Sequence, residues 1–133
     1  MSRDLKDLTP EMQLKVGVLM QLADEAGLDL LVTCTYRSPE EQAALYAIGR
    51  TVPGKIKTRA KPWQSAHQYR KAVDCVPIMN GKPVWDAKDP AWQKYGELAE
   101  KAGLEWAGHW PRFKEFPHAQ MPGFDWRAEK VAA

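Results

Sequence analysis

The stretch AVDCVPIM, residues 72–79, is short, apolar and rich in β-formers, so it predicts a strand. The dipeptide Asn80-Gly81 follows directly and predicts a two-residue hairpin turn, with residues 82–85 returning as the paired strand. One carboxylate, that of Asp74, interrupts the apolar run. Burial of a carboxylate is costly unless it is paired with a cation or binds a metal, so Asp74 is a candidate site residue.

The sequence before this strand predicts two helices, another strand and a long loop. Thr9-Pro10 is typical of a helix start and Gly27 of its end, with apolar residues at helical spacing between them. Residues 29–35 (DLLVTCT) are rich in β-formers and predict a strand. The motif SPEE at 38–41 predicts a capping box that opens a short helix. Residues 50–64 have no apolar period, and a loop of this length in a small domain is usually functional.

The sequence after the hairpin predicts fewer elements. Asp89-Pro90 predicts the start of a helix that ends at Gly103, and residues 104–106 predict a short strand. A further short segment is expected around His118, and the last dozen residues give no clear signal. Because there is no internal repeat or linker, we expect one α+β domain over residues 1–133. Its helices should pack on a short antiparallel sheet.

The composition is ordinary for a soluble globular protein, but the charge is unevenly distributed. Of the 133 residues, 44% are hydrophobic and 27% are charged. The formal net charge of +2 is too small to indicate nucleic-acid binding by itself. Residues 51–73 nevertheless hold six basic side chains and no acid. This basic stretch is either a solvated loop or a surface that favours an anionic polymer, such as nucleic acid or cell wall.

The N-terminal 27 residues carry charges throughout, so they predict no apolar leader, and no apolar run is long enough to span a bilayer. We therefore expect a protein that is made and folded in a cytoplasm, without a membrane partner. Cys34 and Cys75 should then be reduced and buried. Cys75 directly follows Asp74 in the strand, so it should face the opposite side, as core filler and not as a nucleophile.

Three histidines, His67, His109 and His118, are the other candidates for chemistry. His67 and His118 together with Asp74 would make an open zinc site, because three protein ligands leave the fourth position for water. The spacing alone is a weak signal, since many chains contain two histidines and an aspartate. A single histidine is also more often structural than a metal ligand.

Four linked motifs carry a more specific signal. They are TYRS at 35–38, SAH at 65–67, AVD at 72–74, and the stretch from EWAG at 105–108 to Glu115 and PH at 117–118. In this order they resemble the D-Ala-D-Ala carboxypeptidase/VanY-like metallopeptidase family, over about residues 30–119. The segment GRTVPGK at 49–55 is similar to the family's phage-endolysin branch of L-alanyl-D-glutamate peptidases. The resemblance implies a Hedgehog/D-Ala-D-Ala peptidase-like fold.

The resemblance also implies roles for individual residues. It implies that His67, Asp74 and His118 bind Zn²⁺, which would lower the pKa of its bound water to about 7. It assigns Glu115 as the general base that takes the water proton and passes it to the leaving amine. It assigns Arg37 to a substrate carboxylate or to the oxyanion. The alternatives are a surface carboxylate for Glu115 and an ordinary salt bridge for Arg37.

Four positions carry open questions. Ser65 and His109 are candidates for substrate binding, but Ser65 could instead shape its loop, and His109 could be structural. Relatives often have an acid or asparagine at the position of His109. Arg70 replaces a glycine that is usual between two of the ligands, and it would be strained if the position needs a positive φ. Ala107 replaces the first glycine of a Trp-Gly-Gly stretch, whose second glycine is kept.

We therefore expect a zinc-dependent endopeptidase of the peptidoglycan stem peptide, which cleaves the L-alanyl-D-glutamate bond by analogy with the endolysin branch. As a monomeric phage endolysin it would wait in the host cytoplasm and reach the periplasm and cell wall at lysis. The alternatives are a D-alanyl-D-alanine carboxypeptidase or dipeptidase, and a non-catalytic zinc-containing wall-binding module. A nucleic-acid binder that uses residues 55–71 is disfavoured by the small net charge and the lack of a nucleic-acid motif.

Overall fold

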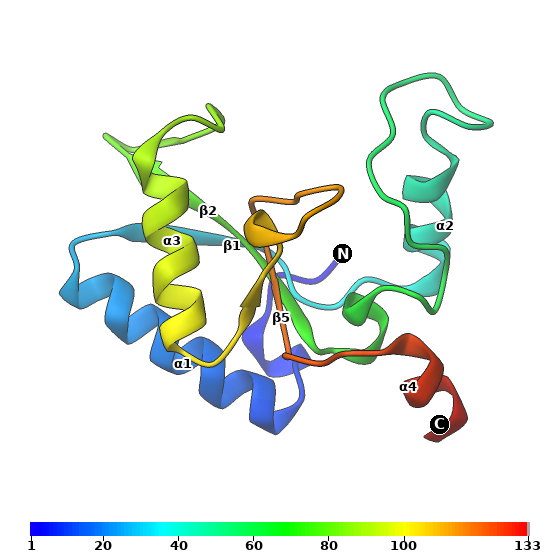
Figure 1. Ribbon diagram of the computed structural model, residues 1–133, viewed down its shortest axis with the longest axis horizontal. Coiled ribbons are helices and arrows are strands. Elements are labelled where there is room, and N and C mark those ends of the chain that lie inside the picture. Colours follow the sequence, from blue (N-terminus) through cyan, green and yellow to red (C-terminus); the bar gives the residue numbers. More distant parts are fainter. Residues whose placement is uncertain (133) are drawn as a thin grey trace.

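The structure is a computed structural model that describes the backbone of residues 1–132 and the side chains of residues 1–129. Figure 1 shows how its helices and strands follow one another. In chain order the elements are η1 (Leu5–Asp7), α1 (Pro10–Glu25), β1 (Asp29–Cys34), α2 (Pro39–Ala47), η2 (Ala66–Tyr69), β2 (Ala72–Met79), β3 (Lys82–Pro83), α3 (Pro90–Lys101), β4 (Glu105–Trp106), η3 (Ala107–His109), β5 (His118–Gln120) and α4 (Trp126–Ala132). In the part of the chain that the structure describes, no helix has the length and apolarity that a membrane span requires.

A small antiparallel sheet is the centre of the molecule. Its strands are ordered β1-β2-β5-β4, and β3 pairs with the free end of β2. The predicted α+β class is therefore confirmed, and the stretch AVDCVPIM forms β2 over its whole length. Because β2 pairs with β1, β3 and β5, a side chain on β2 has partners from distant parts of the sequence on both sides.

The hairpin after β2 forms as expected, but its second strand is shorter. Asn80 and Gly81 both have positive φ, 53° and 74°, as a primed two-residue turn requires. The returning strand covers Lys82–Pro83, although residues 82–85 were expected. Val84 donates its N–H to the Pro77 carbonyl at 2.9 Å, but proline has no N–H to return the bond. The ladder therefore ends at Pro77.

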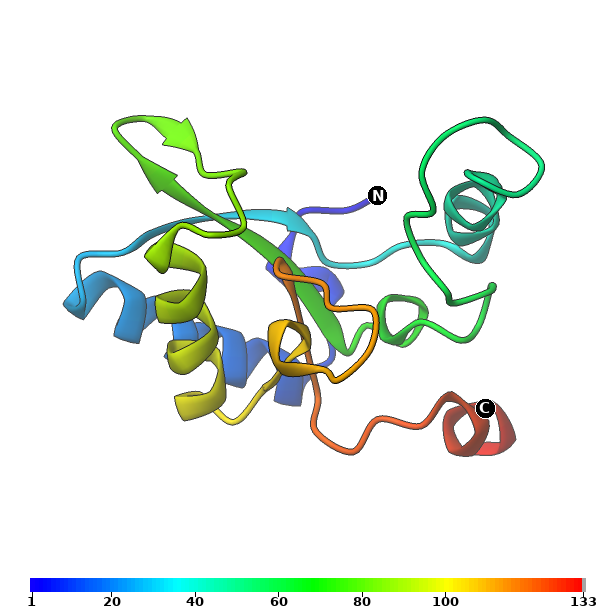
Figure 2. The same ribbon diagram turned by 45° about the horizontal axis from the view of Figure 1, so that its top comes forward.

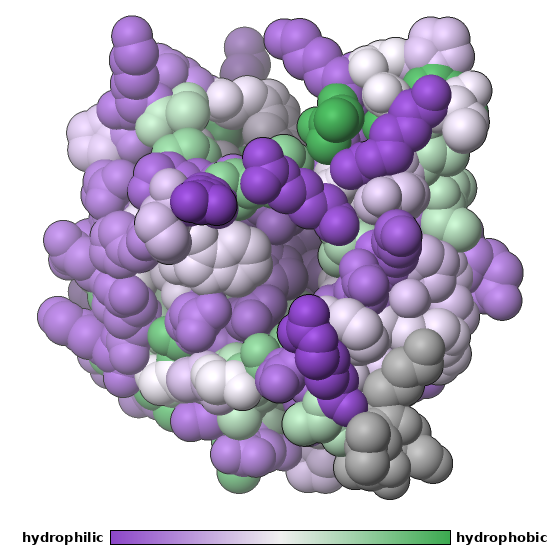
Figure 3. All heavy atoms as spheres, turned by 45° about the vertical axis from the view of Figure 1, so that its right-hand side comes forward, coloured by the Kyte–Doolittle hydropathy of each residue, from purple (hydrophilic) through white to green (hydrophobic). Residues whose placement is uncertain are grey.

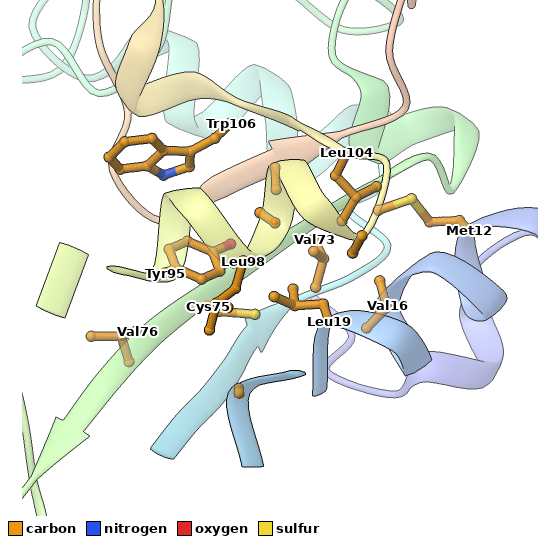
Figure 4. Packing of buried hydrophobic residues seen from close by; sticks show 14 of the residues in the cluster. Met12, Val16, Leu19, Val73, Cys75, Val76, Tyr95, Leu98, Leu104 and Trp106 are labelled. Atoms are coloured by element: carbon orange, nitrogen blue, oxygen red, sulfur yellow. The ribbon is translucent and has the colours of Figure 1, made fainter. Parts of the chain in front are cut away.

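Helices α1 and α3 cover one face of the sheet and bury the main core. Figure 4 shows their apolar side chains packed against Val73 and Cys75 of β2. Both N-caps behave as predicted, because the Thr9 and Asp89 side chains accept hydrogen bonds from the backbone of the first turn. Cys75 is fully buried in this core, so it does lie on the face opposite to Asp74. Burial raises the pKa of its thiol to about 12, which leaves it protonated and unreactive.

Trp106 lies between two glycines at the edge of this core. A Cβ added at Gly96 would lie 2.1 Å from the indole, and a Cβ added at Gly108 would lie 2.2 Å from it. The indole N–H donates to the Phe116 carbonyl at 2.7 Å. These contacts fix the position of the segment between Trp106 and Phe116. This segment contains Glu115, the predicted general base. The glycine of the EWAG motif, Gly108, is therefore a packing requirement.

Helices α2 and α4, η2 and the long loop form a second group. Figures 1 and 2 show α2, η2, the loop between them and α4 grouped away from α1 and α3. The predicted capping box is present, with Ser38 and Glu41 bonded reciprocally at the start of α2. Residues 50–64 form the expected long loop, which Arg50 holds by stacking on Tyr46 and donating to the Thr58 carbonyl at 3.1 Å. Helix α4 has no counterpart in the prediction.

The packing of Trp106 predicts a specific sensitivity to a single methyl group. Gly108→Ala should lower the free energy of unfolding by about 1–3 kcal/mol or more, because its Cβ overlaps the indole. Gly17→Ala is the matched control, since nothing lies within 4 Å of its added Cβ on α1. That change should raise stability by up to about 1 kcal/mol, through helix propensity. Urea unfolding measures both values, and equal effects at the two glycines would contradict the packing argument.

Candidate active site

Two buried imidazoles meet one oxygen of Asp74. His67 lies on η2, and its Nε2 is 3.1 Å from Asp74 Oδ1. His118 lies on β5 directly opposite Asp74 in the sheet register, and its Nδ1 is 3.2 Å from the same oxygen. The exposed fractions of the two imidazoles are only 1% and 7%. The structure thus brings together the three residues that the sequence proposed as ligands.

The outer nitrogen of each imidazole is held by another acceptor. His67 Nδ1 lies 2.8 Å from the Thr35 carbonyl, and His118 Nε2 lies 2.7 Å from Gln120 Oε1. A carbonyl oxygen cannot donate, so each outer nitrogen must carry the hydrogen. In a neutral imidazole the inner nitrogen then directs a lone pair at the Asp74 carboxylate. The lone pairs of both inner nitrogens would then point at the same anionic oxygen, and this arrangement is repulsive unless a cation lies between the nitrogens and the oxygen. The donor set therefore fits a divalent metal.

Without a metal, protonation of the imidazole side supplies the positive charge beside Asp74. Burial alone would lower the pKa of His67, but the charge of Asp74 raises it to about 10. Burial would also raise the pKa of Asp74. The charge of His67 and hydrogen bonds from both imidazoles instead bring it well below its usual range. The pocket therefore strongly favours positive charge beside Asp74 Oδ1.

Cys34 offers a different donor set with His67 and Asp74. One ligand atom from each of these residues lies within 4.8 Å of the others, because a bulge between Val32 and Cys34 places Cys34 opposite Asp74. The Cys34 thiol, however, lies 3.7 Å from His67 Nδ1, the nitrogen that donates to the Thr35 carbonyl. A metal between Cys34 and His67 would break that bond. The side of His67 that faces Asp74 and His118 is therefore the better metal position.

Arg37 lies in the segment between β1 and α2 and contacts Asp74 from the other side. Its Nη2 is 3.4 Å from Asp74 Oδ2, and its Nη1 donates to Gln42 Oε1 at 3.0 Å. Gln42 is fully buried and also donates to the Ala60 carbonyl at 2.8 Å. The sequence resemblance extends to Gln42 but gave it no role in the site, although its position early in α2, five residues after Arg37, could have indicated one. Arg37 is thus held rigidly at the edge of the site.

A cavity of about 400 Å³ opens over this group. Its lining includes Arg37, His67, Glu115 and His118, and Figure 3 shows a hollow with hydrophilic side chains around it. Glu115 is half-buried there, and burial raises the pKa of its carboxyl, although nearby positive charges oppose this. A carboxylate with a raised pKa, in reach of the same cavity, is suited to accept and return a proton.

The comparisons with known proteins agree with this geometry. The family model described as D-alanyl-D-alanine carboxypeptidase matches residues 58–121, which include His67, Asp74, Glu115 and His118. The peptidoglycan L-alanyl-D-glutamate endopeptidase CwlK of Bacillus subtilis is 35% identical over 123 residues, which are 86% of this chain and 74% of CwlK. This chain belongs to the D-alanyl-D-alanine carboxypeptidase family. It is therefore a metallopeptidase, as the resemblance implied.

Solved structures show that the fold is that of the same family. The L-Ala D-Glu endopeptidase ChiX of Serratia marcescens matches with a TM-score of 0.68 and 20% identity, over 88% of this chain and 82% of ChiX. The LD-carboxypeptidase LdcB matches with a TM-score of 0.69 and 21% identity, over 93% of this chain and 62% of LdcB. At these identities the likeness concerns the fold alone.

The two candidate substrate-binding residues have different places in this family fold. Ser65 lines the cavity, and its hydroxyl accepts from the His67 N–H at 3.2 Å, so it caps η2 and orients a ligand. His109 lies outside the described lining of the cavity. Its ring packs edge-on against Trp106, with ring centroids 4.7 Å apart, and its Nδ1 is 3.1 Å from Glu100 Oε1. These contacts support the structural alternative for His109.

Arg70 occupies a left-handed position, as the family's usual glycine suggested. Its φ is 62° and its ψ is 31°, at the C-cap of η2. The guanidinium compensates by contacts with the N-terminal part of the chain. It stacks over Tyr36 at 4.2 Å and donates to the Asp7 carbonyl at 3.0 Å. Arginine is therefore tolerated here because its side chain joins η2 to η1 and to the end of β1.

Gln120 is a site residue that sequence reasoning missed. It lies two positions after His118 on β5, and period-two alternation could have placed it on the same face. Its amide N–H₂ reaches Glu105 Oε2 at 3.5 Å, which leaves Oε1 to accept from His118. Glu105 also accepts from the Trp110 indole at 3.0 Å. This chain of contacts fixes which nitrogen of His118 faces Asp74.

The two possible donor sets predict different metal contents. His118→Ala should lower metal affinity by more than about a hundredfold, because it removes a ligand outright and outer partners alone account for 10–100-fold. Cys34→Ala should keep one metal per chain with nearly unchanged affinity, since the thiol faces the wrong side of His67. Competition with a chelator, followed by elemental analysis, measures both. Loss of metal in Cys34→Ala but not in His118→Ala would reverse the assignment.

The backbone at Arg70 predicts an order of stability. Arg70→Ala loses the contacts with Tyr36 and Asp7 but keeps the left-handed backbone. Arg70→Gly loses the same contacts and relieves the backbone strain. The glycine variant should therefore be more stable than the alanine variant by about 1 kcal/mol. Urea unfolding of the pair measures this difference, and an alanine variant of equal or greater stability would show that the conformation carries no cost.

Proposed function

We propose that this protein is a zinc-dependent endopeptidase that cleaves the L-alanyl-D-glutamate bond of the peptidoglycan stem peptide. The observation that carries the proposal is the convergence of His67 and His118 on one oxygen of Asp74, beneath a cavity that Glu115 also lines. Two neutral imidazoles and a carboxylate suit Zn²⁺ and leave a coordination position open. The choice of bond is supported by the 35% identity to CwlK, which is itself an L-alanyl-D-glutamate endopeptidase.

Zn²⁺ in this site would supply a Lewis acid that makes water nucleophilic at neutral pH. The residues of the chain provide the rest of the reaction. Glu115 takes the proton from the attacking water and delivers it to the leaving nitrogen, and its raised pKa suits both transfers. Arg37, held by Asp74 and Gln42, presents a fixed positive charge to the developing oxyanion.

We place this activity in phage-induced lysis of a bacterial host. The support for this setting is the similarity of residues 49–55 to the endolysin branch. In that role the protein is a monomer that waits in the host cytoplasm and acts in the periplasm and cell wall after release. Its partner is the stem peptide of the wall, with no role for nucleic acid or a membrane.

The role of Glu115 can be tested by digestion of purified peptidoglycan. Glu115→Gln should lower the rate of cleavage by roughly 10²–10⁴-fold, because the amide cannot accept the water proton. The variant should still bind one metal per chain, since Glu115 is not a ligand in this scheme. Mass spectrometry of the fragments from the zinc-loaded wild type should find new amino termini on D-glutamate.

Glu97→Gln, on the exposed side of α3, is the matched control and should cleave like the wild type. New carboxyl termini with release of D-alanine would instead identify a carboxypeptidase of the same family. If zinc-loaded wild type releases no peptide at all, the proposed activity is wrong.

A further inference from the structure

Two guanidinium groups at the cavity are left free by the site described so far. Arg59 and Arg112 both line the cavity and are exposed. Within residues 1–129, neither guanidinium has a hydrogen bond or an acidic partner. Arg37 differs from them, because it is engaged with Asp74 and Gln42. The free pair therefore keeps its hydrogen-bonding capacity for a ligand.

Arg59 is nevertheless held in place. Its guanidinium carbon lies 4.9 Å from the centroid of the Phe113 ring, within the range of a cation–π contact. Phe113 has a φ of 49°, a conformation that non-glycine residues rarely adopt, and its ring also lines the cavity. Arg112 precedes it directly. The long loop and the segment before Glu115 thus meet at the cavity, where Arg59 stacks on Phe113 and Arg112 is also part of the lining.

The charge of the lining is strongly one-sided. Glu115 is the only carboxylate among the described residues that line the cavity, against Arg37, Arg59 and Arg112. The loop that carries Arg59 has no acid anywhere in residues 51–73. Guanidinium groups bind carboxylates through paired, charge-assisted hydrogen bonds. The cavity therefore favours an anionic peptide, and the free pair favours a carboxylate.

The substrate of the proposed function contains such carboxylates. In the stem peptide, D-glutamate continues the chain through its γ-carboxyl group, so its α-carboxylate stays free on the carbon that bears the scissile nitrogen. The next residue, when it is diaminopimelate, carries a second free carboxylate. Both groups lie on the leaving side of the L-alanyl-D-glutamate bond, and amidation of either would remove its charge.

We propose that Arg59 and Arg112 form a carboxylate subsite that binds a free carboxylate on the leaving side of the stem peptide, so that the enzyme selects acidic over amidated stems. This inference rests on the proposed endopeptidase function and adds its substrate preference. The subsite has no part in metal binding or in proton transfer.

The test compares three N-acetylated substrates that contain the same L-alanyl-D-glutamate bond, followed by the γ-linkage to the next residue. The first has both carboxylates, the second has D-isoglutamine in place of D-glutamate, and the third has lysine in place of diaminopimelate. The enzymes are the zinc-loaded wild type, Arg59→Gln, Arg112→Gln and the double variant. Lys57→Gln is the matched control, because Lys57 is exposed on the same loop but outside the described lining. Thermal unfolding verifies that each variant is folded.

Wild type should cleave the first substrate with a kcat/KM about 10–100-fold above that of the substrate lacking the bound carboxylate, as expected for a charge-assisted hydrogen bond. The double variant should lose this preference through a fall on the two substrates that keep the bound carboxylate, with no fall on the substrate that lacks it. Lys57→Gln should keep the wild-type ratio. The substrate whose penalty disappears in the double variant identifies the bound group as the α-carboxylate or the diaminopimelate carboxylate.

Cleavage of all three substrates with the same ratios in wild type and double variant would overturn the subsite and leave the endopeptidase function intact. Equal losses on all three substrates would also overturn it, because general charge attraction alone would explain them. If wild type cleaves none of the three, the proposed function falls and the subsite falls with it.

Discussion

The structure depends on one carboxylate placed in an apolar strand. Asp74 cannot be buried on β2 without positive charge or hydrogen-bond donors around it. The fold supplies them from three separate segments, since His67 comes from η2, His118 from β5 and Arg37 from the connection between β1 and α2. The same oxygen that needs a cation to be stable is the one that offers a metal its third ligand. A cation beside Asp74 is therefore needed both for the stability of the fold and for metal binding at the site.

The surroundings of Asp74 are organised so that each group has one available orientation. The Thr35 carbonyl and Gln120 fix the imidazoles, and Gln42 fixes Arg37. Trp106, wedged between two glycines, fixes the segment that brings Glu115 to the cavity. Preorganisation of this kind is what an active site needs, because groups that are already oriented cost no reorganisation during the reaction.

The parts of this structure that sequence could predict are those with local causes. The capping box at Ser38, the turn at Asn80-Gly81 and the whole of β2 follow from neighbouring residues. The metal ligands His67, Asp74 and His118 were predicted from the motif resemblance, and the structure places them side by side. The contact of Arg59 with Phe113 could not be predicted, because it joins residues 54 positions apart through two irregular segments. Helix α4 is short, and an ion pair between Glu129 and Lys71 connects it to the rest of the protein. A helix of this length depends on such tertiary contacts to form.

Arg70 has a consequence for how this chain can change over evolutionary time. A glycine at this position is free of its neighbours, whereas the arginine has recruited Tyr36 and Asp7 as partners. A return to glycine now removes contacts that hold η1 against the site, and a change of Tyr36 leaves the arginine with strain and less support. The stability effects of substitutions at Arg70 and Tyr36 are therefore coupled, because the two side chains are in contact, whereas the bond to Asp7 goes to its backbone carbonyl and survives a change of that side chain. A chain with arginine at this position accordingly accepts fewer changes at Tyr36 than a chain with glycine.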